Sequence, residues 1–252
     1  MFNTLVVLQA RLSSSRLPGK VLKPILGQPM IYRQVERLRR AKTIKNLVVA
    51  TSIDPSDDHL ADYLKLSSIP FVRGNLNDVL ARFETAIKLF PDAEHIIRVT
   101  GDCPLIDPCI LDQIVNCHIL EKNDYTSNTV EVTYADGLDV EVIKRTIFEE
   151  ILKTATLPYE REHVTPYIYT HSEKYKIKHF KYSGEAFDHL RWTVDHQEDY
   201  ELVTKIFENL YLRNPSFGAE DILKLINENP DLALINSKYI RNEQLVKLLK
   251  NF

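Results

Sequence analysis

The chain has 252 residues, of which 44% are hydrophobic and 27% charged, and its formal net charge is −3. This composition is ordinary for a water-soluble globular protein, and the slight acidity argues against a nucleic-acid binder with a basic face. No apolar run reaches the roughly 18 residues of a membrane span, and residues 5–10 are too short an apolar stretch for a signal peptide. The cysteines, Cys103, Cys109 and Cys117, lack the spacing of a zinc site, so we expect free thiols in the reducing cytoplasm.

The first half of the chain alternates short apolar runs with amphipathic segments. The runs predict strands at 5–8, 46–52, 69–72 and 95–99. The amphipathic segments predict helices at 30–41, 56–65, 75–90 and about 108–121. This alternation predicts an α/β fold with a mostly parallel, doubly wound sheet and right-handed crossovers.

The second half is less regular. Its patterns predict strands at 125–128, 138–143, 175–182 and 190–194, and helices at 146–152, 159–171 and 195–210. The last 35 residues predict two further helices, with Leu245, Leu248 and Leu249 apolar near the end. No linker is visible, so we expect one domain over 1–252, with a small inserted arm at about 125–185.

A cationic loop follows the first predicted strand. No acidic residue precedes Glu36, whereas five cations do: Arg11, Arg16, Lys20, Lys23 and Arg33. Ligands of open α/β sheets bind at the carboxyl ends of the strands, where loop amides, hydroxyls and cations suit a polyphosphate. We therefore expect Ser15, Arg16, Gly19 and Lys20 to wrap a triphosphate. The loop matches neither the Walker pattern nor the dinucleotide-binding pattern, since both need glycines that are absent here.

Two aspartates follow two other predicted strands. Asp102 comes directly after the strand at 95–99, and Asp195 directly after the strand at 190–194. A carboxylate beside a polyphosphate indicates magnesium, which takes one or two carboxylates plus phosphate oxygens. The structural alternative is helix capping. Asp107 suits the cap of the helix after Asp102 better, whereas Asp195 taken alone would be an ordinary N-cap.

Further polar residues could contact an acceptor substrate. Asp139 and Glu141 lie two apart on a predicted strand and so share a face, which would either meet the acceptor or be solvated. Arg161 and His163 could clamp an anionic acceptor, although their spacing on a helix favours only one of them pointing inward. Arg191, four residues before Asp195, is a fifth candidate.

The motifs together are similar to a known family. They read LQARLSSSRLPGKVL at 8–22, GDCPLIDP at 101–108, YADGLDVEV at 134–142, REHVTPYI at 161–168 and RWTVDHQED at 191–199. Over about 4–210 the chain resembles the spore-coat-polysaccharide cytidylyltransferase-like proteins. These belong to the CMP-sugar synthetase group, which includes the KDO and acylneuraminate cytidylyltransferases.

The resemblance implies a fold like that of the nucleotide-diphospho-sugar transferases, with a Rossmann-like three-layer arrangement. It also implies a magnesium-dependent cytidylyltransferase, a homodimer, that activates a sugar, sugar acid or sugar phosphate with CTP for surface polysaccharide or glycan synthesis. Carried over by motif, the residues that meet the nucleotide are Gln9, Ala10, Arg11, Ser14, Arg16, Lys20 and Thr100. Asp102 and Asp195 would hold Mg²⁺. Thr100 stands where the KDO enzymes carry glutamine.

Residues and resemblance agree on a hypothetical mechanism. An acceptor oxygen attacks the α-phosphorus of CTP, and pyrophosphate leaves in line while Arg16 and Lys20 neutralise its charge and Asp102 holds the metal. Two alternatives stay open. One is a glycosyltransferase of similar fold, although Asp102-Cys103-Pro104 lacks the usual second aspartate. The other is a non-catalytic nucleotide-binding protein. The acceptor and its attacking group are not specified by the sequence.

Overall fold

The first apolar run forms the centre of the fold. In the computed structural model, which describes residues 2–241, strand β1 (Thr4–Gln9) pairs in parallel with both β4 (Asn46–Ser52) and β6 (His95–Thr100). Successive side chains of β1 enter different core clusters, Val6 on one face of the sheet and Val7 on the other. Burial on both faces explains why this strand reads as a continuous apolar run.

The central sheet has seven strands in the order β5-β4-β1-β6-β8-β7-β9. The outer strands are β5 (Phe71–Gly74), β7 (Tyr125–Ser127), β8 (Glu141–Lys144) and β9 (Ile177–His179). β8 runs antiparallel to β6 and β7, and the other pairs in the sheet are parallel. A two-stranded hairpin is formed by β2 (Pro24–Ile25) and β3 (Gln28–Pro29). The prediction of a mostly parallel α/β sheet is confirmed.

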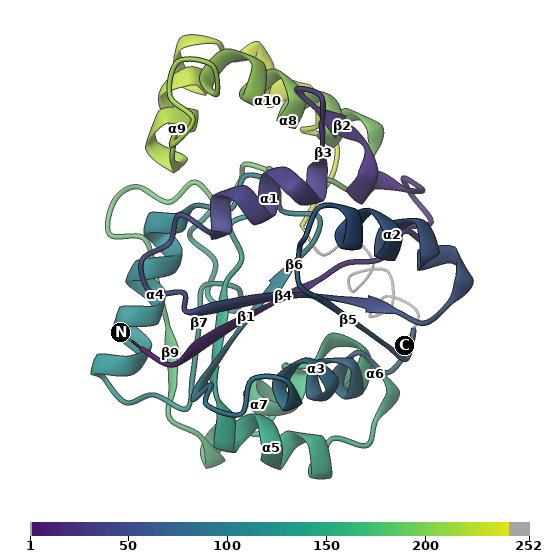
Figure 1. Ribbon diagram of the computed structural model, residues 1–252. Coiled ribbons are helices and arrows are strands. Elements are labelled where there is room, and N and C mark those ends of the chain that lie inside the picture. The colour runs from purple at the N-terminus through teal and green to yellow at the C-terminus, as the bar shows by residue number, and fades with distance from the viewer. Residues whose placement is uncertain (1, 242–252) are drawn as a thin grey trace.

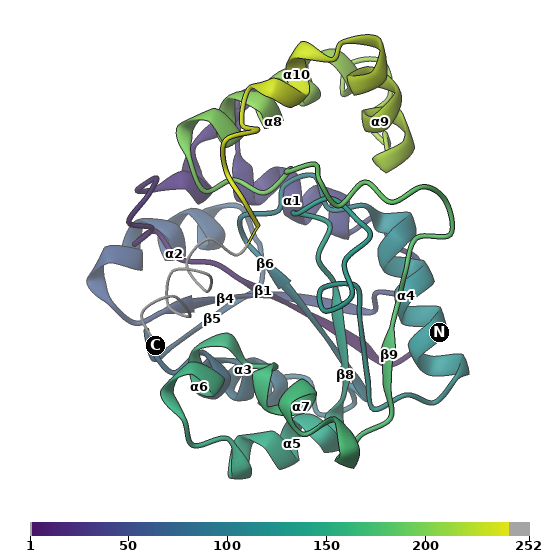
Figure 2. The same cartoon turned by 180° about the vertical axis from the view of Figure 1, so that it is seen from behind.

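Helices cover both faces of the sheet, which gives three layers (Figure 1). One face carries α1 (Met30–Leu38), α2 (Asp58–Leu66) and α4 (Pro108–Leu120). Beyond α1 lie α8 (Gln197–Leu210), α9 (Ala219–Glu228) and α10 (Asp231–Leu234), as Figure 2 also shows. The opposite face carries α3 (Val79–Lys88), α5 (Arg145–Thr154), α6 (Pro158–His163) and α7 (Pro166–Thr170). Short 3₁₀ turns are η1 (Lys20–Leu22), η2 (Pro55–Asp57) and η3 (Ser172–Lys174).

Two predicted elements differ in the structure. The strand predicted at 190–194 contributes only an isolated parallel bridge between Arg191 and Asp136. The helix predicted at 159–171 is divided into α6 and α7, because Val164 has a φ of 73° and the ring of Pro166 cannot continue a helix.

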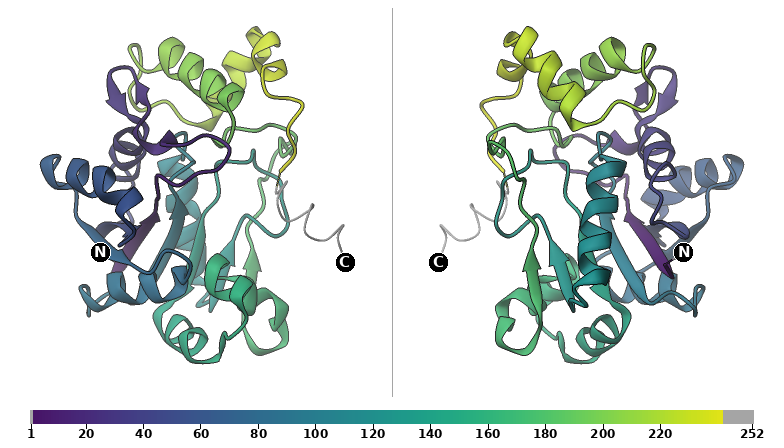
Figure 3. Two further views of the ribbon diagram at one scale, coloured as in Figure 1. Left: turned by 90° about the vertical axis from the view of Figure 1, so that its right-hand side faces the viewer. Right: turned by 90° about the vertical axis from the view of Figure 1, so that its left-hand side faces the viewer.

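The segment expected to form an arm, 125–185, supplies three strands of the main sheet and the helices α5–α7 at the lower end in Figure 3. Its role in dimerisation stays a prediction. Leu245, Leu248 and Leu249 lie outside the described residues. Among the helices that are described, none is long and apolar enough to cross a membrane.

Candidate active site

The cationic loop leaves the carboxyl end of β1 and folds back on itself. The Leu12 carbonyl accepts hydrogen bonds from the amides of Ser14 and Gly19 at 2.8 and 3.0 Å. The fully buried Asp57 carboxylate accepts the Leu12 amide at 2.6 Å. Gly19 has a φ of 69°, which glycine adopts without strain, and η1 begins directly after it. This turn carries Lys20 into the interior, where the residue is 7% exposed.

Gly101 brings the ends of β1 and β6 together. Its amide donates to the Gln9 carbonyl at 2.7 Å, and a Cβ at this position would lie 2.8 Å from the Ala10 Cβ. Asp102 follows directly, so its carboxylate lies beside the cationic loop. Asp107 caps α4 as expected, which leaves Asp102 available for another role.

Lys20 joins the two aspartates that the sequence singles out. Its Nζ donates to Asp102 Oδ2 at 3.2 Å, to Asp195 Oδ1 at 2.9 Å and to the Val194 carbonyl at 2.7 Å. The Val194 amide donates to the Asp102 carbonyl at 2.8 Å, which ties the two backbone segments together. The structure therefore places Lys20, Asp102 and Asp195 in one cluster.

The charges of this cluster stabilise one another. Burial lowers the pKa of Lys20, but Asp102 and Asp195 outweigh this effect and raise it above its usual value. Burial alone would raise the pKa of Asp102, but the charge of Lys20 outweighs burial and holds this pKa below its ordinary range. The pKa of Asp195 is held far below its usual value by Lys20, Arg16 and Arg191, against the effect of burial. All three central groups are therefore charged at neutral pH.

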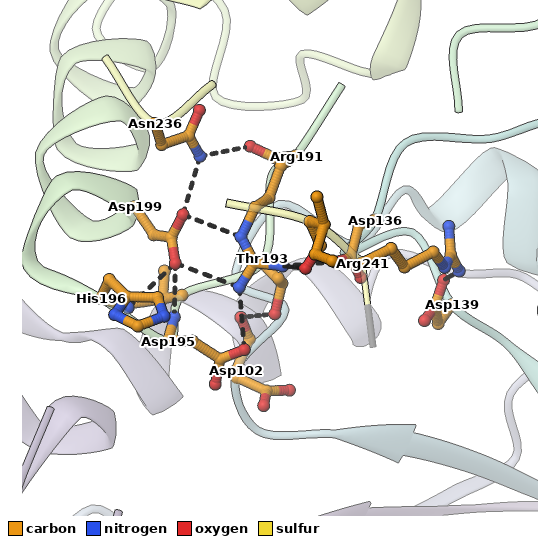
Figure 4. A network of polar contacts seen from close by, with 12 residues as sticks. Asp102, Asp136, Asp139, Arg191, Thr193, Asp195, His196, Asp199, Asn236 and Arg241 are labelled. Atoms are coloured by element: carbon orange, nitrogen blue, oxygen red, sulfur yellow. Dashed lines mark hydrogen bonds and ion pairs between the residues drawn. The ribbon is translucent and has the colours of Figure 1, made fainter. Parts of the chain in front are cut away.

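Two arginines also contact Asp195. Arg16 Nη2 lies 2.6 Å from Asp195 Oδ1, and Arg191 Nη2 lies 2.9 Å from Oδ2. The Arg191 guanidinium reaches two more carboxylates as well, Asp136 at 2.7 Å and Asp199 at 3.0 Å (Figure 4). The five donors of one guanidinium thus orient three carboxylates at once.

Asp199 links this network to the start of α8 and to the C-terminal segment. It is fully buried, and Oδ2 accepts the amides of Asp195 and His196, both at 2.9 Å. The Asn236 amide group donates to Asp199 Oδ1 at 2.8 Å and to the Arg191 carbonyl at 2.9 Å (Figure 4). The chain around Asp195 is therefore fixed from two sides.

A third side of the site is formed by the turn at 136–139. Gly137 has a φ of 110°, and a Cβ there would lie 2.5 Å from the Thr193 amide nitrogen. Burial and the neighbouring Asp139 carboxylate raise the pKa of Asp136 to about 7, although Arg241 and Arg191 oppose this shift. Arg241, from the C-terminal segment, pairs with Asp139 (Figure 4) and donates to the Tyr134 carbonyl.

The predicted nucleotide-binding residues lie around the same strand ends. Arg11 is exposed and forms no hydrogen bond or ion pair with the rest of residues 2–241, whereas Ala10 is 3% exposed. Gln9 Oε1 is buried with no hydrogen-bond partner among the described residues. The Thr100 carbonyl accepts Gln34 Nε2 at 2.7 Å, and Ser15 is exposed.

Other predicted acceptor residues have different neighbours. Glu141 is 3% exposed, pairs with Arg98 and accepts the Tyr125 hydroxyl. Arg161 pairs with Asp78, 2.8 Å away, at the N-terminus of α3. His163, at the end of α6, is exposed. The structure therefore does not join Glu141, Arg161 and His163 to the Lys20–Asp102–Asp195 cluster through any direct contact among the described side chains.

Several residues of the site were not singled out by the sequence. Asp136 was recognised only as a turn and Asp199 only as part of a helix start, while Asn236 and Arg241 had no local signal. Within residues 2–241, no group of three or more His, Cys, Asp or Glu side chains is arranged to hold a metal ion.

Comparisons with known proteins decide the family. A family model described as cytidylyltransferase matches residues 5–245. The chain belongs to the cytidylyltransferase family. It is therefore a CTP-dependent nucleotidyltransferase, and the resemblance inferred from its motifs is confirmed. The glycosyltransferase and non-catalytic alternatives are disfavoured by this match.

Two of the relatives of this cytidylyltransferase span more than nine tenths of its length. It is 34% identical over 240 residues to the spore coat polysaccharide biosynthesis protein SpsF of Bacillus subtilis (strain 168), covering 92% of this chain and 98% of that protein. A cytidylyltransferase structure from Leptospira borgpetersenii serovar Hardjo-bovis (strain JB197) superimposes with a TM-score of 0.88 at 30% identity, covering 96% of this chain and 100% of that one. An 8-amino-3,8-dideoxy-manno-octulosonate cytidylyltransferase of Shewanella sp. (strain W3-18-1) is 32% identical over 144 residues, covering 55% of this chain and 57% of that protein.

Proposed function

We propose that this cytidylyltransferase transfers a cytidylyl group from CTP to a sugar or sugar acid, with magnesium bound, and releases pyrophosphate for glycan or surface polysaccharide synthesis. The observation that carries the proposal is the arrangement of Asp102, Asp195 and the Val194 carbonyl around one cationic group, beside an acid-free cationic loop. A relative named for spore coat polysaccharide synthesis and another named for an octulosonate acceptor support the acceptor class.

The donor set fits magnesium. The Lys20 ammonium is already surrounded by three hard oxygen atoms, two from carboxylates, and Mg²⁺ prefers such oxygens. Two protein carboxylates do not fill its coordination shell, so phosphate oxygens and water would supply the other ligands. Asp102 and Asp195 would hold the ion, which would polarise the α-phosphate as a Lewis acid.

The cationic loop would bind the triphosphate. We assign Arg11, Arg16 and Lys20 to its phosphates, together with hydroxyls and amides of the turn at Ser14, Ser15 and Gly19. Arg16 and Lys20 would neutralise the charge that develops on the departing pyrophosphate. Gln9 Oε1 is a buried acceptor without a partner among the described residues, which suits the amino group of a cytosine. Ala10 and Thr100 would lie close to the same base.

The acceptor would approach from the 136–139 turn. We assign Asp139 to its hydroxyl groups, and Glu141, Arg161 and His163 to more distant contacts on the α6 side. Arg191 would act on the acceptor only indirectly, because its side chain is 8% exposed and its guanidinium holds Asp136, Asp195 and Asp199.

We also propose a cytoplasmic homodimer. Free thiols at all three cysteines support the compartment. The 125–185 segment exposes Leu157, Tyr159 and Tyr169, which would contribute to a subunit contact. Size-exclusion chromatography with light scattering tests the dimer, and a monomer at micromolar concentration would refute it.

Pyrophosphate release tests the proposed activity. The enzyme is assayed with CTP, UTP, ATP and GTP against sugar acids, neutral sugars and sugar phosphates, with and without Mg²⁺. We expect release with CTP and one acceptor class, dependent on Mg²⁺, and loss of at least 100-fold in kcat in Asp102→Asn. Release that is independent of a divalent metal, or unchanged turnover in Asp102→Asn, would contradict the assignment.

A further inference from the structure

The Lys20 ammonium group uses all three of its N–H groups in hydrogen bonds to oxygen atoms. Its three N–H groups meet Asp102 Oδ2, Asp195 Oδ1 and the Val194 carbonyl, all within 3.2 Å. The Lys20 side chain is 9% exposed. The two backbone segments that carry these oxygens are tied together, since the Val194 amide and the Thr193 hydroxyl both donate to the Asp102 carbonyl, at 2.8 and 3.2 Å.

The carboxylates that would hold a metal are thus already neutralised by the cations that would bind the triphosphate. Asp195 Oδ1 contacts both Lys20 and Arg16. Together Asp102 and Asp195 carry two negative charges, and Lys20 and Arg16 carry two positive charges. A divalent ion arriving alone would have to displace the ammonium or lie against it, and both alternatives cost free energy.

A triphosphate changes this balance. It offers the displaced Lys20 and Arg16 a new anionic partner, while its oxygens complete the metal's coordination shell. The carboxylates can then exchange the loop cations for the metal ion, while those cations bind the phosphates. The exchange keeps every charged group paired.

We propose that Lys20 fills the cation position between Asp102 and Asp195 in the substrate-free enzyme, so that the metal binds tightly only together with the triphosphate. Lys20 thus has a second role besides phosphate binding: it excludes a metal ion that arrives without nucleotide. The inference rests on the proposed magnesium site, and it concerns the order of binding rather than the identity of the acceptor.

Metal affinity without nucleotide tests the inference apart from turnover. Free Mn²⁺ is titrated by electron paramagnetic resonance in the presence of wild-type enzyme, Lys20→Met or Lys23→Met. Lys23 is the matched control, since it is a cation of the same segment whose ammonium lies 4.8 Å from the centre of the Tyr200 ring. We expect Lys20→Met to bind Mn²⁺ about tenfold tighter than wild type or more, because charge-assisted hydrogen bonds no longer have to be broken. Lys23→Met should stay within twofold of wild type.

A second variant and a second ligand sharpen the test. Lys20→Gln lacks the charge but keeps a hydrogen-bond donor, so it should also bind Mn²⁺ tighter than wild type, and it replaces Lys20→Met if that variant fails to fold. In wild type, a non-hydrolysable CTP analogue should tighten Mn²⁺ binding to the enzyme at least tenfold, beyond the Mn²⁺ that the analogue binds without enzyme. Equal or weaker Mn²⁺ binding by both Lys20 variants would overturn the inference and leave the proposed metal site standing. If no folded variant bound Mn²⁺ beyond the amount that the analogue binds without enzyme, both the inference and the metal site would be overturned.

Discussion

Replacing Arg191 by methionine should destabilise the protein strongly. The guanidinium lies 2.7, 2.9 and 3.0 Å from oxygens of Asp136, Asp195 and Asp199, and the Asp199 side chain is fully buried. Removing one partner of a buried ion pair leaves uncompensated charge, which costs about 3–5 kcal/mol. For a chain of this size that corresponds to a fall in Tm of roughly 6–20 °C.

The loss of unfolding free energy caused by Arg191→Met should depend on pH. The pKa of Asp136 is about 7 even with Arg191 present, so at pH 6 this carboxyl can be neutralised by protonation. The cost of Arg191→Met should therefore be larger at pH 8 than at pH 6.

Urea unfolding followed by circular dichroism at both pH values measures the cost. Lys205→Met is the control, because Lys205 makes an exposed ion pair with Glu201, 3.8 Å away, on α8, the helix that also carries Asp199. Such surface pairs contribute about 0–1 kcal/mol. If Arg191→Met cost no more than Lys205→Met, the view of Arg191 as the organiser of these carboxylates would be wrong.

Three further predictions concern separate parts of the fold. Gly137→Ala should destabilise the protein by about 2–5 kcal/mol, because a Cβ would overlap the Thr193 backbone and φ is 110°. Gly27→Ala is the control, since Gly27 has a φ of 74° but a Cβ there would meet nothing within 4 Å. It isolates the conformational cost of about 1–2 kcal/mol. Thermal melts compare the two, and equal losses would exclude the steric argument. Arg11→Met should raise the KM for CTP about tenfold without lowering Tm, since Arg11 has no partner to lose among the described residues. A lower Tm with an unchanged KM would contradict the assignment of Arg11 to the triphosphate. Burial lowers the pKa of His118 to about 3, so the folded state resists protonation. The neutral His118 side chain therefore stabilises the fold fully above about pH 6.5, and this stability is lost as the pH falls toward 3, by ~1.4 kcal/mol per pH unit. His118→Gln should flatten the dependence of unfolding free energy on pH in urea titrations. An unchanged slope would refute the assignment.

The parts of the fold that depend on local pattern were predictable. The apolar run of β1 and the alternation of strands and helices up to α4 defined the parallel half of the sheet, because these signals are contained within each segment. The failure at 190–194 has the opposite cause. That segment is held by contacts with residues distant in sequence, such as the bridge from Arg191 to Asp136.

Residues of the site were likewise predictable only where their signal is local in the sequence. Lys20, Asp102 and Asp195 were predicted to lie together because Lys20 belongs to the loop after one predicted strand, the aspartates follow two others, and ligands bind at the carboxyl ends of strands. Asn236 and Arg241 come from a segment that the chain's topology alone returns to the site, and no local pattern marks them. Glu141 looked equivalent to Asp139 in a strand, yet it pairs with Arg98, because β8 begins at Glu141, opposite Arg98 of β6, whereas Asp139 lies before the strand.

The most direct test of the account follows two labels from one nucleotide. CTP labelled with ³²P at the α-phosphate or at the γ-phosphate is incubated with Mg²⁺, the enzyme and the acceptor that supports pyrophosphate release. Transfer of the cytidylyl group predicts that the α-label enters the sugar product while the γ-label appears in pyrophosphate. Appearance of the γ-label in the sugar, or release of CDP in step with product, would contradict attack at the α-phosphorus and the assignment built on Lys20, Asp102 and Asp195.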